Sequence, residues 1–109
     1  MRSDSKWALN NLFFMKQAHV YVSGFVQGVG FRAYVRSKAR KLGVFGWIRN
    51  LSDDRVEGVF QGKDEDIKKL IAVCRRGPFF AQVTDVVVDW EEAKESFTEF
   101  SKRETVNTR

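Results

Sequence analysis

The order in which strand and helix patterns follow one another is the strongest constraint that this sequence places on its fold. Alternating apolar residues predict strands, and apolar residues at three- and four-residue spacing predict amphipathic helices. Six segments show one of these patterns: a strand at 18–26, a helix at 31–42, strands at 44–51 and 56–61, a helix at 64–76 and a strand at 81–90. The elements therefore follow one another as β-α-β-β-α-β.

This order is that of the ferredoxin-like, or split βαβ, arrangement of the α+β class, in which two helices cover one face of an antiparallel sheet. Phe97 and Phe100 indicate a short additional edge strand. A chain of 109 residues is the size of one domain. We expect that domain at residues 17–102, with a flexible N-terminal extension at 1–16 and a frayed C-terminal tail at 103–109.

Composition narrows the classes of protein that remain. No apolar run approaches the roughly 18 residues of a membrane-spanning helix, so we expect no membrane partner. One cysteine and one histidine are too few for a conventional zinc or histidine-based metal site. We therefore expect no metal and no cofactor. A single cysteine, which excludes an internal disulfide, suits a reducing compartment and favours a cytoplasmic location.

The charge of the chain is unevenly distributed. The formal net charge is +5, and basic residues gather between Arg32 and Arg49, a stretch without an acid. Acidic residues gather at 85–99. A surface polarised in this way can attract a small anion to its basic end. A solvated helix face accounts for the same basic stretch equally well.

The glycine-rich segment 24–32 reads G-F-V-Q-G-V-G-F-R and joins the first predicted strand to the first predicted helix. Successive backbone N–H groups in such a loop can converge on an anion, and a helix N-terminus adds unpaired amides and partial positive charge. Arg32, in the first helical turn, can place its guanidinium on the same anion. The segment predicts a phosphate site, with a turn that only reverses the chain as the alternative.

Residues 28–33 also fit the G-x-G-x-x-A form of the dinucleotide-binding fingerprint. A nucleotide-binding half needs a longer run of parallel strands after the first helix. Here one strand precedes a tight hairpin, and the remaining chain is too short to supply the rest. We therefore exclude a dinucleotide site.

Two separated motifs resemble those of the acylphosphatase family. The first family motif, G-x-V-Q-G-V-x-F-R, corresponds to residues 24–32. The second, G-W-V-[KR]-N with a later valine and glycine, corresponds to residues 46–50 with Val56 and Gly62 at matching spacing. The resemblance covers about residues 17–101. One departure is Asp54, where the family usually has glycine; a hairpin turn there needs positive φ, which aspartate tolerates better than most residues.

The resemblance implies an enzyme that hydrolyses the carboxyl–phosphate bond of a small-molecule acyl phosphate, giving a carboxylate and inorganic phosphate. It implies that the phosphate is held by six residues: Gln27, Gly28, Val29, Gly30, Phe31 and Arg32. It also implies that Arg32 and Asn50 are the catalytic residues, with Asn50 orienting the attacking water. Because an acyl phosphate is a mixed anhydride with a good leaving group, we expect catalysis without a metal. We also expect the protein to be a monomer.

Two other functions are compatible with the predicted fold. RNA-binding domains of this fold stack bases on strand aromatics in a K/R-G-F/Y-G/A-F-V-x-F/Y pattern. The strand at 56–61 lacks that pattern, so we expect no nucleic-acid partner. A degenerate regulatory domain is the other alternative, and the presence of both Arg32 and Asn50 argues against it.

Overall fold

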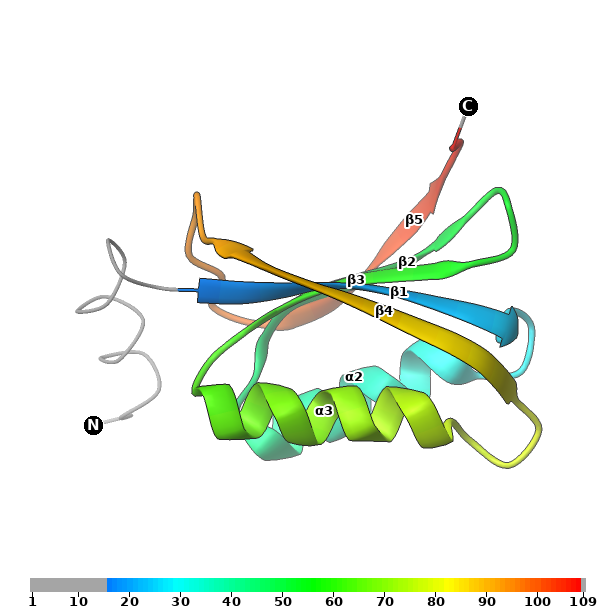
Figure 1. Ribbon diagram of the computed structural model, residues 1–109, viewed down its shortest axis with the longest axis horizontal. Helices are drawn as coiled ribbons and strands as arrows, with labels where there is room; N and C mark the ends of the chain where they lie inside the picture. The colour runs from blue at the N-terminus through cyan, green and yellow to red at the C-terminus, as the bar shows by residue number, and fades with distance from the viewer. Residues whose placement is uncertain (1–15, 109) are drawn as a thin grey trace.

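Two helices pack against one face of a five-stranded sheet in the computed structural model, which describes residues 16–108 (Figure 1). The elements are β1 (Lys16–Phe25), α2 (Phe31–Leu42), β2 (Phe45–Leu51), β3 (Val56–Gln61), α3 (Asp64–Arg76), β4 (Gln82–Glu92) and β5 (Phe100–Val106). This architecture confirms the predicted ferredoxin-like α+β fold. The extension predicted at 1–16 lies outside the described residues except for Lys16, which begins β1. No helix within residues 16–108 is long and apolar enough to cross a membrane.

The strands lie in the order β4-β1-β3-β2-β5, so β3 separates β1 from β2 as the split βαβ arrangement requires. The first four strands pair antiparallel, but β5 pairs parallel to β2, and the sheet is therefore mixed rather than antiparallel throughout. The reason lies in the connection that follows β4. Because β4 ends at the end of the sheet where β2 begins, a chain that crosses there enters β5 in the direction of β2.

A buried glutamine supports this crossing connection. The Nε2 atom of Gln61 donates to the carbonyl oxygen of Glu95 at 2.7 Å and to Oε1 of Gln17 at 2.7 Å. Its Oε1 accepts from the backbone N–H of Phe97 at 3.1 Å. With its amide satisfied on both sides, Gln61 can remain buried while it holds the connection at the end of the sheet.

The last strand is longer than the sequence pattern predicts. β5 reaches Val106, so residues 103–106 belong to the sheet and not to a frayed tail. The backbone N–H of Ser52 donates to the Val106 carbonyl at 3.0 Å, and that of Thr108 donates to Ser52 Oγ at 2.9 Å. This strand is held by backbone pairing at an edge, and most of its residues are exposed, so its sequence lacks the apolar alternation that marks a half-buried strand.

The hydrophobic core lies between the helices and the sheet. One face of β1 contributes Ala18, Val20 and Val22, which are buried. Each helix presents an apolar stripe to that face: Phe31, Val35 and Ala39 from α2, and Ile67, Leu70, Ile71 and Cys74 from α3. Full burial of a large apolar side chain stabilises a fold by roughly 1.5–3 kcal/mol. Burial also raises the pKa of the Cys74 thiol to about 12, which is the behaviour of a core cysteine rather than a reactive one.

The turn between β2 and β3 has the backbone conformation that the sequence predicts for Asp54. Its φ is 77°, in the left-handed region. The neighbouring Asp53 stabilises the same turn, because its carboxylate accepts from the backbone N–H of Arg55 at 3.2 Å and from the Arg55 Nε at 2.9 Å. Aspartate at position 54 thus occupies a conformation that most L-residues adopt only at a cost.

We predict that Asp54→Val lowers the free energy of unfolding by about 1–2 kcal/mol, because a β-branched residue is disfavoured in the left-handed region. Asp54→Gly should stay within about 1 kcal/mol of the parent, since relief of strain is offset by greater freedom of the unfolded chain. Urea unfolding measures both. The control is Asp85→Val, in exposed extended backbone of β4, which should cost nothing. Equal losses for Asp54→Gly and Asp54→Val would show that the side chain, rather than φ, matters.

Candidate active site

The loop from residue 26 to residue 30 joins β1 to α2 and contains two residues with positive φ, Gly28 at 75° and Gly30 at 78°. A side chain at either position would strain the backbone. A Cβ built on either glycine would meet no atom within 4 Å. The glycines are therefore required by the backbone conformation of the loop, and the space outside them is open.

The N-terminus of α2 carries backbone donors that find no backbone acceptor in the described turns and loops. Gly30 is the N-cap residue, no side chain caps the helix, and its first turn contains no acid. In the turns and loops of residues 16–108, the N–H groups of residues 27–31 donate to no backbone carbonyl. The first turn of α3, in contrast, contains three acids of its own, Asp64, Glu65 and Asp66. Of the two helix N-termini, that of α2 therefore has open space beside it and a positive potential that no acid of its first turn neutralises.

Arg32 lies in the first turn of α2, as the sequence predicts. Its Nη1 donates one long hydrogen bond, 3.4 Å, to the carbonyl oxygen of Arg103 in β5. None of the ion pairs found within residues 16–108 involves Arg32. Most of the donors of this guanidinium therefore remain available to an anion. Sequence reasoning missed the contact with β5, because it assigned Arg103 to the tail.

Asn50 lies near the end of β2, opposite Val56 of β3. Val56 in turn pairs with the core residue Val22, and paired residues share a face of the sheet, so Asn50 lies on the helix-facing side. Its Oδ1 is buried and has no hydrogen-bond partner among the described residues. An unsatisfied buried carbonyl is costly. This oxygen is therefore a ready acceptor for a water molecule or for a donor group of a ligand.

The side chain of Gln27 connects the loop to the hairpin that contains Asn50. Its Nε2 donates to the Leu51 carbonyl at 2.8 Å and to the Arg55 carbonyl at 2.9 Å. These two carbonyls belong to the two sides of the β2–β3 turn. The structure therefore brings the glycine-rich loop alongside the residue that follows Asn50. The motif predicts phosphate binding by the backbone amides of the loop, but no signal in it predicts these contacts of the Gln27 side chain.

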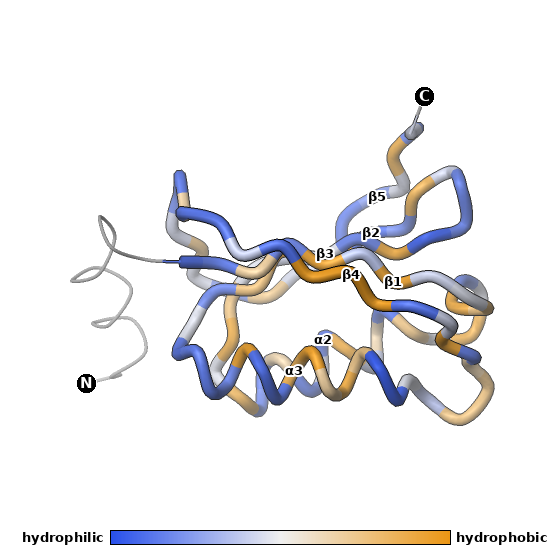
Figure 2. The backbone as a smooth tube through the Cα atoms, viewed as in Figure 1, coloured by the Kyte–Doolittle hydropathy of each residue, from blue (hydrophilic) through white to orange (hydrophobic). Residues whose placement is uncertain are grey.

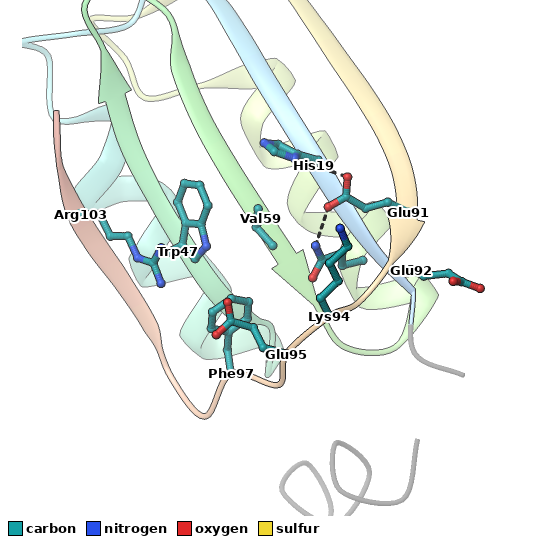
Figure 3. Close-up of a pocket in the computed structure, with 10 residues that line it drawn as sticks. His19, Trp47, Val59, Glu91, Glu92, Lys94, Glu95, Phe97 and Arg103 are labelled. Carbon is teal, nitrogen blue, oxygen red and sulfur yellow. Dashed lines mark hydrogen bonds and ion pairs between the residues drawn. The ribbon is translucent and has the colours of Figure 1, made fainter. Parts of the chain in front are cut away.

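A second polar cluster occupies the face of the sheet opposite the helices. A hollow of about 610 Å³ lies there, and Figure 3 shows Arg103 beside Trp47 on one side of it and Glu91 beside His19 on the other. The Arg103 guanidinium is 4.6 Å from the centre of the Trp47 ring. Glu57 at this face receives a hydrogen bond from Arg49 at 2.7 Å and contacts His19 at 2.5 Å. No sequence pattern singled out this cluster.

The charges of this second cluster are largely paired with one another. Burial alone would raise the pKa of Glu57, but hydrogen bonds from His19 and Arg49 outweigh it and hold that pKa below its usual value. The carboxylate therefore stays ionised and paired. No three His, Cys, Asp or Glu side chains within residues 16–108 form a group that could hold a metal ion.

Fold and loop together define a ferredoxin-like α+β domain with a glycine-rich β1–α2 connection and an arginine in the first turn of the following helix. The family model for acylphosphatase matches residues 18–102. The acylphosphatase of Chloroflexus aurantiacus is 58% identical over 76 residues, which cover 70% of this chain and 83% of that relative. The chain belongs to the acylphosphatase family of hydrolases, which confirms the resemblance of its two motifs.

Solved structures agree with this assignment. The crystal structure of acylphosphatase from Bacillus subtilis superposes with a TM-score of 0.79 at 35% identity, covering 82% of this chain and 99% of that one. The structure of an acylphosphatase from Coxiella burnetii gives a TM-score of 0.73 at 42% identity, covering 82% of this chain and 93% of that one. The fold of residues 16–108 is therefore that of the family.

Proposed function

We propose that this protein hydrolyses acyl phosphates to a carboxylate and inorganic phosphate, without a metal ion. The observation that carries the proposal is the set of N–H groups at residues 27–31, which donate to no backbone carbonyl in the turns and loops of the described chain. They lie next to Arg32, at a helix start without acids. Backbone donors of this kind, with a helix N-terminus, bind phosphate groups well. Membership of the acylphosphatase family supports the choice of an acyl phosphate over other phosphate compounds.

The reaction makes modest chemical demands. The oxygen of a water molecule attacks phosphorus, the bond from phosphorus to the acyl oxygen breaks, and the electron pair leaves with the carboxylate. The protons of the water end on the phosphate product and the solvent. Because a carboxylate is a good leaving group, no general acid is needed to protonate it. The protein has to hold the phosphoryl group, spread its charge and position the water.

The residues named from the sequence divide these tasks. In the proposed complex, the amides of Gln27, Gly28, Val29, Gly30 and Phe31 hold phosphate oxygens, and the guanidinium of Arg32 binds them through two parallel hydrogen bonds. Arg32 would give up only one long hydrogen bond, that to the Arg103 carbonyl. The site would thus neutralise the phosphoryl group without a cation other than its own arginine.

Asn50 has the remaining task in this proposal. Its buried Oδ1 lacks a partner among the described residues and would accept a hydrogen bond from the attacking water. The hydrogen bonds of Gln27 to the β2–β3 turn keep the loop beside this strand end. We further propose that the chain acts as a monomer in the cytoplasm, because all proposed site residues lie within one domain and its cysteine is a free thiol.

We predict that the enzyme hydrolyses acetyl phosphate equally well with and without EDTA and has little activity on p-nitrophenyl phosphate. The monoester has a poorer leaving group, and the site offers no acid to assist it. Phosphate release measures both activities. Loss of acetyl phosphate hydrolysis in EDTA, with recovery on addition of a divalent cation, would contradict metal independence.

We predict that Arg32 and Asn50 variants fail in different ways. Arg32→Ala should lower kcat/KM by on the order of 10²–10³-fold and weaken the binding of inorganic phosphate, and Arg32→Lys should not restore either, since a point charge cannot reproduce the guanidinium fork. Asn50→Ala should abolish turnover while phosphate affinity stays largely intact. Steady-state kinetics and isothermal titration with inorganic phosphate give the two readouts.

The matched control for these variants is Arg36→Ala, which removes an arginine of α2 one turn beyond the proposed site. It should leave kinetics and phosphate affinity near those of the parent. Each variant must first show a native unfolding transition. If Arg32→Ala and Asn50→Ala lose phosphate binding equally, Asn50 is a phosphate ligand or a structural support, and the water-orienting role is wrong.

A further inference from the structure

Three phenylalanines are unusually exposed at one end of the molecule. The exposed fractions are 62% for Phe25, 91% for Phe79 and 74% for Phe80. The rings of Phe79 and Phe80 meet edge to face, with centroids 5.0 Å apart. Large exposed apolar groups that gather in one place mark a binding surface more often than isolated ones do. We call these three residues the phenylalanine rim.

Strand pairing brings the members of the rim together. Phe25 is the last residue of β1 and pairs with Gln82, the first residue of β4. Phe79 and Phe80 occupy the centre of the turn just before β4, which a hydrogen bond of 3.0 Å from the Ala81 N–H to the Pro78 carbonyl closes. In Figure 2, the end of β1 and this turn lie at the same end of the molecule.

The rim borders the glycine-rich loop. Phe25 directly precedes residues 26–30 in the chain. The turn also begins next to the start of α2, because a Cβ built on Gly77 would lie 3.5 Å from the Cε2 atom of Phe31. Phe31 is the first residue of α2 and the neighbour of Arg32. The rim therefore adjoins the start of the glycine-rich loop and the first residue of α2, on the β4 side of β1.

The chemistry of the rim suits one part of the proposed substrate. An acyl phosphate has an anionic end, which the loop would hold, and an acyl group that must extend away from it. The segment 77–83 contains no charged residue. An uncharged aromatic surface beside an anion site would contact an apolar acyl group favourably and would gain nothing from the methyl-sized acyl group of acetyl phosphate.

We propose that the phenylalanine rim binds the acyl group and makes the enzyme select acyl phosphates with an aromatic or extended apolar acyl group. This inference rests on the proposed acyl phosphate hydrolysis. Ring contacts of this kind are worth about 2- to 10-fold each in affinity. The preference should therefore appear mainly in KM, because the rim touches the acyl group and not the reacting phosphorus.

The test compares benzoyl phosphate with acetyl phosphate as substrates. The parent enzyme should show the lower KM for benzoyl phosphate. The double variant Phe79→Ala/Phe80→Ala should raise the KM for benzoyl phosphate about tenfold and leave kinetics with acetyl phosphate within about twofold. Phe25→Ser should act in the same direction. The control is Val87→Ala, an exposed apolar residue further along β4 that is 47% exposed, which should change neither substrate.

The outcomes separate this inference from the function on which it rests. If the parent hydrolyses neither compound, the proposed function fails, and the rim proposal fails with it. If the parent hydrolyses both and the double variant leaves the ratio of their KM values unchanged, only the rim proposal is overturned. An unchanged ratio together with a smaller sedimentation coefficient for the double variant would mean that the rim is instead a contact between copies of this chain.

Discussion

Two hydrogen bonds from one side chain hold the glycine-rich loop against the sheet. Gln27 Nε2 donates to the carbonyls of Leu51 and Arg55, on the two sides of the β2–β3 turn. Each such hydrogen bond contributes about 0.5–1.5 kcal/mol to the stability of the fold, and the loss of one leaves a carbonyl oxygen without its donor. These hydrogen bonds also affect the position of Arg32, because the loop leads directly into α2 and Arg32 lies in the first turn of that helix.

The edge of the sheet also contributes to this arrangement. Gln61 supports the connection that crosses to β5, and β5 then places the Arg103 carbonyl beside Arg32. The side chain of Arg103 extends over Trp47 on the opposite face of the sheet. One strand thus contacts both the proposed phosphate site and the hollow of the open face. We expect the placement of Arg32 to depend on β5, although β5 contains little of the core.

Sequence patterns predict the fold well here because its core-forming elements carry their own periodicity. The stripes of α2 and α3 and the alternation in β1 follow directly from burial of one face. The positive φ of Asp54 was also predictable from the family resemblance, because the family usually has glycine at this position of the turn. The two site motifs placed Arg32 at a helix start and Asn50 at a strand end, and the structure agrees on both positions.

The features of the structure that the sequence could not predict have no periodic pattern of apolar residues. β5 is held by backbone hydrogen bonds at an exposed edge, so its composition resembles that of a tail. Glu57 is buried although it is charged, because His19 and Arg49 come to it from neighbouring strands. The bonds of Gln27 to the hairpin likewise join residues far apart in the chain. Each of these features depends on contacts between strands, which local pattern does not specify.

We propose that residues 27–31 bind a phosphate group through their backbone amides. A titration of ¹⁵N-labelled protein with inorganic phosphate, followed by amide chemical shifts, tests it most directly. We expect saturable shifts at Gly28, Val29, Gly30 and Phe31, and no saturable shift at His19 on the open face. Shifts confined to the basic outer surface of α2 around Lys38, or none that saturate in the loop, would contradict it.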